Sequence, residues 1–466
     1  MVINVIFTLS GALLSSFAFE PVGLWWSAIL GLILFFRALK ITRYPILISF
    51  AYGLILNASV LIWSGKYVGL LPWLALSLLQ GFFYLPVGLA YRRSRNLWWA
   101  IVALLLMEEV RSHFPFGGFG WTRVAFSQSE SPLVPVVAYG GVLLLTFLTL
   151  ASALLLACPS IGKVLTLAAI TLIAILLPSN PQGSGEIKVI AIQGNTPRPG
   201  LDFNSRAKEV FSLHEKATRE FANSQFDVII WPENAIDIDP SRDSDLRARI
   251  YQLTNDFQTP LISGVVLDGQ TGPQNASVMY GVGGQIESTY IKRSLTPFGE
   301  YIPWRTLAQW ASPLARTVKD FAPGVDRVVH RVNGAAIGPV ICYEIIKDEL
   351  VRDMAMNSKM LIVHTNSATF VGTAQSAQQL AITRIRAIEH SRTIVSVSTV
   401  GLSAIIDNNG VVIKQIPPDV QGVLSGIINL NEHQTFADKF SVWSSSIVIL
   451  FAVVIAFLQR RRESYL

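Results

Sequence analysis

The sequence predicts a helical membrane domain joined to an α/β layered domain. Hydrophobic residues make up 51% of the 466 residues and charged residues only 15%, whereas a soluble protein of this length carries about 25% charged residues. The apolar excess is concentrated in residues 1–180 and 442–458. In the polar sequence between them, short β-branched runs alternate with helical patterns, which is typical of α/β layers.

Eight apolar stretches predict about eight spans, although three of them are shorter than the roughly 17–25 residues of a membrane helix. We expect seven helices in 1–180 and one at 441–459. The first begins at the chain start without a basic region, so we expect a retained helix and not a cleaved signal. The stretches are Val2–Phe19, Val22–Phe36, Tyr44–Trp63, Tyr67–Tyr91, Leu97–Val110, Pro132–Ala157, Val164–Leu177 and Val442–Leu458.

Basic residues predict the orientation of these spans. The net charge is +6 and the isoelectric point about 9.3, but the cations cluster in short loops beside apolar stretches, which favours membrane orientation over nucleic-acid binding. Alternation then places both termini in the cytoplasm and the large polar segment outside. The orienting residues are Arg37, Lys40, Arg43, Arg92, Arg93, Arg95, Arg460, Arg461 and Arg462.

The polar segment 187–432 is long enough for one sizeable core, and a Pro- and Gly-rich linker at 178–185 precedes it. The Asn409-Gly410 pair within 400–412 predicts a hairpin with a two-residue turn. Strands are expected at Ile187–Ile192, Val228–Trp231, Leu261–Val266, Gly338–Ile341, Leu361–His364 and Ile394–Ser398, and helices at Ser205–Phe221, Asp243–Phe257 and Ala374–Arg392.

Three reactive side chains each lie at or near the end of a predicted strand, namely Glu233, Lys292 and Cys342. Active sites of α/β sheets gather at strand ends, so three strands could bring them to one cleft. A carboxylate can act as general base toward a thiol, and an ammonium group can lower the thiol pKa and stabilise an oxyanion. The sequence therefore predicts a cysteine nucleophile with its base and electrophile.

Each residue also has a simpler interpretation. Cys342, one of only two cysteines, could be a small buried hydrophobe. Glu233 could interact with a helix dipole, and Lys292 could be a solvated strand residue. Glu300 and Glu344 could orient the lysine or a substrate amine, or could lie on the surface. The six histidines show no metal-ligand spacing, so we predict no metal.

An aromatic, Gly-rich segment lies at 114–121, beside Glu108, Glu109 and Arg111. It is either an interfacial aromatic belt or a contact for an acyl chain or headgroup. Charges at this place are costly unless they are paired or interfacial.

The sequence resembles the bacterial apolipoprotein N-acyltransferases over nearly its whole length. The resemblance rests on Trp231-Pro232-Glu233, on Lys292 followed by Pro297-Phe298-Gly299-Glu300, and on Cys342-Tyr343-Glu344. It implies a nitrilase-like αββα sandwich at 187–432 outside the inner bacterial membrane, with a multi-pass helical domain. It assigns Glu233 as base, Lys292 as oxyanion stabiliser and Cys342 as nucleophile, supported by Glu300, Tyr343 and Glu344.

The resemblance further implies acyl transfer without a cofactor. An acyl chain would pass from a membrane phospholipid through a Cys342 thioester to the α-amino group of a diacylglyceryl-cysteine lipoprotein. Neither a metal nor a nucleic acid takes part in this reaction, and a monomer is expected. Substrate contacts are expected at Arg111, Phe119, Trp121 and Phe298.

Three segments depart from the family pattern, and none of the departures replaces a residue of the triad. Gly120 stands where proline is usual, Asn366–Phe370 replaces the usual Asn-Asp-x-Trp-Phe, and 398–401 lacks an asparagine before Gly401. These changes leave open which acyl donor the protein prefers and which shape its substrate loops have.

Two other functions remain open on the residues alone. A membrane-anchored amidase or nitrilase would use the same triad on a small amide, although a single anchor helix would suffice for it. A non-enzymatic scaffold or transporter component is disfavoured by the intact Glu233, Lys292 and Cys342.

Overall fold

The computed structural model describes residues 2–66, 69–183, 185–197, 208–221, 225–311, 316 and 318–463. Side chains are described for all of these except residues 310, 311, 441, 442 and 460–463, so the orienting role predicted for Arg460, Arg461 and Arg462 lies outside the described side chains. The chain divides into two compact units. Unit 1 comprises Met1–Ser179 and Thr435–Leu466, and unit 2 comprises Asn180–Gln434.

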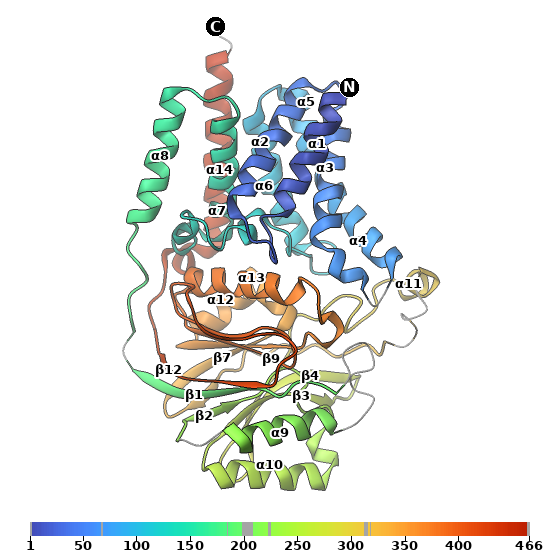
Figure 1. Cartoon of the computed structure of the whole chain (residues 1–466), viewed down its shortest axis with the longest axis vertical. Helices are drawn as coiled ribbons and strands as arrows, with labels where there is room; N and C mark the ends of the chain where they lie inside the picture. Colours follow the sequence, from blue (N-terminus) through green and yellow to red (C-terminus); the bar gives the residue numbers. More distant parts are fainter. Residues whose placement is uncertain are drawn as a thin grey trace. The chain divides into compact units, whose positions relative to one another are not determined.

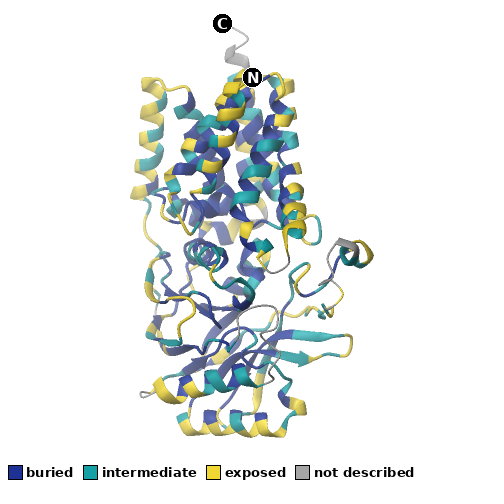
Figure 2. Cartoon of the chain, turned by 45° about the vertical axis from the view of Figure 1, so that its right-hand side comes forward, coloured by how far each residue is buried: buried dark blue, intermediate teal, exposed yellow. Residues whose placement is uncertain are grey.

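Unit 1 is helical (Figure 1). Its apolar side chains lie both inside the bundle and on its outer surface, and α8 buries only Ala174 (Figure 2). A bundle with an apolar outer surface is typical of a protein that lies in lipid. The helices are α1 (Val2–Ser16), α2 (Trp25–Ile41), α3 (Pro45–Val60), α4 (Leu70–Phe82), α5 (Leu85–Ser94), α6 (Leu97–His113), α7 (Val137–Ala157), α8 (Ile161–Leu176) and α14 (Phe436–Glu463).

Two stretches within the described residues are long and apolar enough to cross a membrane, Leu70–Ser94 and Val134–Ala157. The first includes α4 and α5 and the second ends with α7. Four further apolar helices are only 10–17 residues long. A helix of 16 residues reaches about 24 Å, which is less than the roughly 30 Å of a bilayer core. Two of the eight predicted spans thus coincide with stretches of sufficient length and hydropathy, and the predicted fourth span is divided into α4 and α5.

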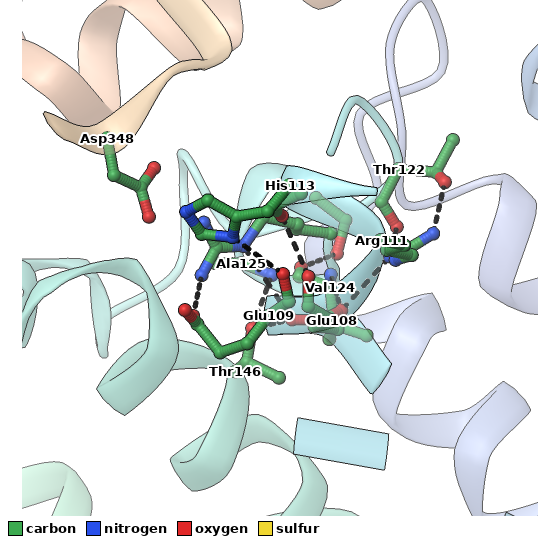
Figure 3. Close-up of polar contacts among 12 residues, drawn as sticks. Glu108, Glu109, Arg111, His113, Thr122, Val124, Ala125, Thr146 and Asp348 are labelled. Atoms are coloured by element: carbon green, nitrogen blue, oxygen red, sulfur yellow. Dashed lines mark hydrogen bonds and ion pairs between the residues drawn. The ribbon is translucent and has the colours of Figure 1, made fainter. Parts of the chain in front are cut away.

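A segment without α-helix, residues 114–136, connects α6 to α7 and is largely buried within unit 1. It includes two short 3₁₀ turns, Val124–Ser127 and Val134–Val136. Its backbone N–H groups need acceptors there, since water does not reach them. Glu108 on α6 accepts from Val124 N at 2.8 Å, from Thr146 Oγ1 at 2.8 Å and from the Arg111 guanidinium at 3.2 Å (Figure 3). Arg111 in turn donates to the Thr122 carbonyl at 2.7 Å. This buried cluster holds the segment in place.

Unit 2 contains two six-stranded sheets, each with three parallel central strands and antiparallel flanks. The first has the order β12-β1-β2-β3-β4-β5, and the second has the order β11-β10-β9-β8-β7-β6. The first sheet contains β1 (Glu186–Gln193), β2 (Val228–Ile230), β3 (Leu261–Asp268), β4 (Pro273–Tyr280), β5 (Ile286–Ile291) and β12 (Gly422–Asn429). The second contains β6 (His330–Val332), β7 (Ala335–Ile341), β8 (Met360–Thr365), β9 (Ile394–Ser398), β10 (Ser403–Ile406) and β11 (Val412–Ile416).

The two sheets pack face to face, with helices outside both (Figure 1). Alternation along β1 explains this, because Val189 belongs to the core between the sheets, whereas Ile190 belongs to the core beneath the outer helices. The predicted α/β layered fold is confirmed as an αββα sandwich. Helices α9 (Glu209–Phe221) and α10 (Ser244–Phe257) cover the first sheet, and α12 (Asp348–Met356) and α13 (Gln375–His390) cover the second.

The predicted two-residue turn of the hairpin is wrong. Strands β10 and β11 do pair, but residues 407–411 form a longer loop, and the register shifts between Ile405 and Ile406. Asp407 Oδ1 accepts from Asn409 N at 2.9 Å and from Val411 N at 2.8 Å. This local capping by an aspartate favours the wider loop over a tight turn.

Removing the Glu108 carboxylate should destabilise unit 1. Glu108→Leu leaves the Arg111 charge and the Val124 N–H buried without this acceptor, and we expect a loss of about 3–5 kcal/mol in the free energy of unfolding. Thermal and denaturant unfolding of detergent-solubilised protein would measure this loss. Glu130→Gln, at an exposed position of the same segment, should change it by less than about 0.5 kcal/mol; equal effects would contradict the role of Glu108.

Candidate active site

Cys342 is the first residue after β7 and begins a short 3₁₀ turn, Cys342–Ile346. Its φ is +50°, in the left-handed region that costs a residue with a side chain about 1–3 kcal/mol. The residue is half-buried. The side chain of Gln379, on α13, donates to the Cys342 carbonyl at 3.1 Å. The turn therefore presents the thiol at the end of its strand in a conformation that its neighbours must hold.

Lys292 is the first residue after β5 and is 1% exposed. Its Nζ lies 2.8 Å from Glu300 Oε2 and 3.5 Å from Glu233 Oε1. Burial lowers the pKa of Lys292, but the two carboxylates outweigh it and raise the pKa above its ordinary value. The amine is therefore a fixed positive charge in the site.

Glu233 follows β2 by three residues, and its carboxylate contacts both Lys292 and the thiol of Cys342. Burial raises the pKa of Glu233, while Lys292 acts in the opposite direction. Burial and the negative Glu233 also raise the pKa of the Cys342 thiol. The thiol therefore keeps its proton in the resting site, and Glu233 can accept that proton at a pH above its own raised pKa.

Asn275, on β4, joins the two carboxylates and was missed at the sequence level. Its Nδ2 donates to Glu233 Oε1 at 2.7 Å and to Glu300 Oε1 at 2.8 Å. Its backbone carbonyl accepts from Lys292 N at 2.8 Å. Strand β4 was not predicted, and for the strand before Lys292 no residue range was predicted, because both β4 and β5 mix polar and small residues. The positions of Glu300 and Lys292 in the sequence also gave no indication that the side chain of Asn275 would link the two carboxylates.

Glu344 is fully buried and connects the nucleophile turn to the lysine strand. Its carboxylate accepts from Ile341 N at 2.8 Å, Arg293 N at 2.8 Å, Ser294 N at 3.0 Å and Tyr290 Oη at 2.9 Å. The possibility that Glu300 and Glu344 lie on the surface is therefore wrong. Tyr343 is 4% exposed, and its ring lies 4.7 Å from the Lys347 ammonium.

The expected substrate contacts are distributed over both units. Phe298, in unit 2, is 55% exposed at a φ of +64°. In unit 1, Trp121 is buried and its ring stacks on Phe119 with centroids 6.2 Å apart. Arg111 is 1% exposed and donates to Glu108 and Thr122 (Figure 3). It also donates to Gln80, so its buried guanidinium does not face a substrate.

Two of the departures from the family pattern have a structural explanation. A Cβ on Gly120 would lie 2.7 Å from Ser112 Oγ, so the larger residue that is usual there would collide with this serine. In the segment 398–401, Thr399 Oγ1 donates to the backbone carbonyl of Glu233 at 3.1 Å. A hydroxyl thus stands beside the candidate base where an amide was expected.

Comparison with known proteins covers both units. Residues 10–155 match the family model of the apolipoprotein N-acyltransferase N-terminal domain, and residues 188–438 match that of carbon-nitrogen hydrolases. The chain is 30% identical to the apolipoprotein N-acyltransferase of Mycolicibacterium smegmatis, covering 96% of this chain and 83% of that protein. It is 28% identical to the enzyme of the same name from Pseudomonas syringae pv. tomato, covering 96% and 95%.

Solved structures with some similarity cover about half of this chain. One is the CN-hydrolase superfamily protein XC1258 from Xanthomonas campestris, with a TM-score of 0.41 and 20% identity over 53% of this chain and 91% of that one. Another is an amidase from Nesterenkonia sp., with a TM-score of 0.40 and 16% identity over 55% and 93%.

Replacing the Glu344 carboxylate by its amide should weaken the site. In Glu344→Gln, an NH₂ group faces either the Ile341 N–H or the Arg293 and Ser294 N–H groups, and each buried unmade bond costs about 1–3 kcal/mol. We expect a lower melting temperature and slower alkylation of Cys342 by iodoacetamide. Glu349→Gln, at an exposed position nearby, is the control, and indistinguishable variants would contradict the connecting role of Glu344.

Proposed function

The chain belongs to the apolipoprotein N-acyltransferase family, an acyltransferase family with a carbon-nitrogen hydrolase domain, and from this premise we propose a mechanism in which Cys342 carries the acyl group. The observation that supports it is the contact of Glu233 with both Cys342 and Lys292, from three different strand ends. The reaction attaches an acyl chain to the amino terminus of lipoproteins, and the mechanism below supplies its donor and intermediate.

The first step is the attack of sulfur on an ester carbonyl of a phospholipid. Glu233 takes the thiol proton as the S–C bond forms, since neither group ionises readily alone. Lys292 stabilises the oxyanion of the tetrahedral intermediate. When the C–O bond breaks, Glu233 returns the proton to the leaving alkoxide, and lysophospholipid departs from a thioester.

The second step transfers the acyl group to nitrogen. The α-amino group of a diacylglyceryl-cysteine attacks the thioester carbonyl, and Glu233 accepts a proton from this amine. The C–S bond then breaks, and the proton returns to sulfur with formation of the amide. Two easier steps thereby replace one difficult transfer. Phe298, Phe119 and Trp121 are the proposed contacts for the two lipid substrates.

We further propose that all eight apolar stretches lie in the inner membrane of a bacterium, with unit 2 outside the cytoplasm. Tilted neighbours and local thinning of the bilayer accommodate helices shorter than its core. The basic residues at the end of α2 and before α3, and those at the end of α5, then lie on the cytoplasmic side. They are Arg37, Lys40, Arg43, Arg92, Arg93 and Arg95. The proposed state is a monomer that uses no nucleic acid.

Incubation of the purified protein with phospholipid alone tests the first step. We expect one acyl adduct on the Cys342 peptide, removable by neutral hydroxylamine, together with release of lysophospholipid. Mass spectrometry measures both. Cys342→Ala should show neither, while Cys158→Ala should match the wild type. Absence of an adduct on folded wild-type protein would overturn this mechanism, and release of an amine from small amides would then favour the amidase.

The acid limb of the acylation rate should lie above the ordinary range of a glutamate. The pKa of Glu233 is raised, so the carboxylate needed as base is present above that pKa and is lost as pH falls through it. Stopped reactions across pH would measure the limb. In Glu233→Gln the rate should fall by at least about 100-fold; a rate independent of pH from 4 to 8 would contradict Glu233 as base.

Labelling in whole cells tests the orientation. In a protein lacking Cys158 and Cys342, a cysteine at the exposed position of Gln285 should react with a membrane-impermeant maleimide. A cysteine replacing Tyr44, beside Arg43, should react only after permeabilisation. The opposite pattern would reverse the proposed topology.

A further inference from the structure

A hydrogen-bonded chain of four polar side chains, three of them buried and Ser288 half-buried, connects the two sheets of unit 2. Ser288 Oγ lies 2.7 Å from His330 Nδ1, and His330 Nε2 lies 2.9 Å from Ser277 Oγ. Ser277 Oγ also lies 2.9 Å from His364 Nε2, and His364 Nδ1 lies 2.9 Å from the Trp231 carbonyl. Both histidines and Ser277 are 0% exposed.

The register of the strands explains how these groups meet. Asn275, Ser277 and Met279 alternate along β4 onto the face that packs against the second sheet, as the place of Met279 in the intersheet core shows. His364 follows Ile362 by two residues on β8 and faces the first sheet in the same way. The hydrogen-bonded side chains thus form a polar row between the two sheets. On β4 this row continues from Ser277 to Asn275.

The acceptor at one end fixes the direction of every hydrogen bond. Burial lowers the pKa of His330 to about 3 and that of His364 to about 4, so both rings are neutral near pH 7. A carbonyl only accepts, so His364 donates from Nδ1 to Trp231, and its Nε2 must accept from Ser277. Ser277 then accepts from His330 Nε2, and His330 Nδ1 accepts from Ser288. One tautomer of each ring satisfies the whole chain.

The His364 end of this hydrogen-bonded chain lies next to the candidate base, Glu233. Trp231 precedes Glu233 by two residues, and the Glu233 carbonyl accepts from Thr399 Oγ1. Trp231 and Glu233 come from the first sheet, whereas His364 and Thr399 come from the second, which also carries Cys342. Two hydrogen bonds therefore fasten the backbone of the base to the sheet of the nucleophile.

We propose that His364 and Thr399 are positioning residues for Glu233, which set the carboxylate against the Cys342 thiol, and that Ser277, by donating to His364 Nε2, keeps His364 in the tautomer that donates to Trp231. The proposal rests on the proposed function of Glu233 as base. Lys292 and Asn275 contact the Glu233 carboxylate, and both belong to the side of the first sheet. They hold it within that sheet but do not fix its distance from Cys342.

Paired substitutions separate this role from simple packing. In His364→Asn, the side-chain NH₂ group takes the place of Nδ1–H and can still donate to Trp231. In His364→Gln the amide reaches the place of Nε2, and in His364→Leu no donor remains. Likewise Thr399→Ser keeps the hydroxyl, and Thr399→Val removes it with little change of shape. Ser288→Ala alters only the far end of the chain and is the control.

The first readout is the rate of thioester formation with saturating phospholipid, together with its KM. We expect His364→Asn, Thr399→Ser and Ser288→Ala to retain the rate within about threefold. His364→Gln, His364→Leu and Thr399→Val should lose about 10- to 100-fold in rate with little change in KM, because a misplaced base slows the chemical step. Melting temperatures identify any variant that has failed to fold.

The second readout does not need the acyl donor. In a Cys158→Ala background, the pH dependence of Cys342 alkylation by iodoacetamide reports the proximity of Glu233 to the thiol. His364→Leu and Thr399→Val should shift this profile, whereas His364→Asn and Thr399→Ser should not. The proposal is overturned if folded His364→Leu keeps the wild-type rate and profile, or if His364→Asn loses as much as His364→Leu. Failure of the acyl-transfer mechanism would instead show as a wild-type protein without an adduct.

Discussion

The placement of one buried ammonium group constrains the whole of unit 2. Lys292 is 1% exposed and needs negative partners, because an unpaired charge in the interior costs several kcal/mol. Glu300 and Glu233 provide them, and Asn275 links these two carboxylates. Asn275 lies on β4, Lys292 directly follows β5 and Glu233 follows β2. The charge of Lys292 can therefore be satisfied only when the first sheet is correctly formed.

The nucleophile belongs to the other sheet, and the two sheets are therefore joined by polar side chains as well as by an apolar core. Glu344 connects the turn of Cys342 to the segment after Lys292. His364 and Thr399 connect the second sheet to the segment that carries Glu233. Apolar packing is non-directional, whereas hydrogen bonds fix distances. These bonds hold the relative register of the sheets at the place where the two halves of the site meet.

Much of this could be predicted from the sequence, for physical reasons. The strands that precede Glu233 and Cys342 are continuous runs without polar side chains, because strands buried on both faces are apolar throughout. The family predicted from the three motifs is confirmed. Strand β4 was missed because its inward face carries Asn275 and Ser277, and Asn275 was missed with it. The ends of the helices in unit 1 differ from prediction because hydropathy does not register Arg111 and His113, which α6 includes.

The φ of +50° at Cys342 has a consequence for studies of trapped complexes. A side chain of any size at this position keeps the backbone under strain, so Cys342→Ala and Cys342→Ser retain the local energy of the native turn while removing the thiol. Glycine adopts positive φ at no steric cost, and Cys342→Gly would relax the turn and let Gln379 and Glu344 bond to a different backbone path. Cys342→Gly would thus gain stability, but its turn would resemble that of the wild-type enzyme less closely than the turns of Cys342→Ala and Cys342→Ser.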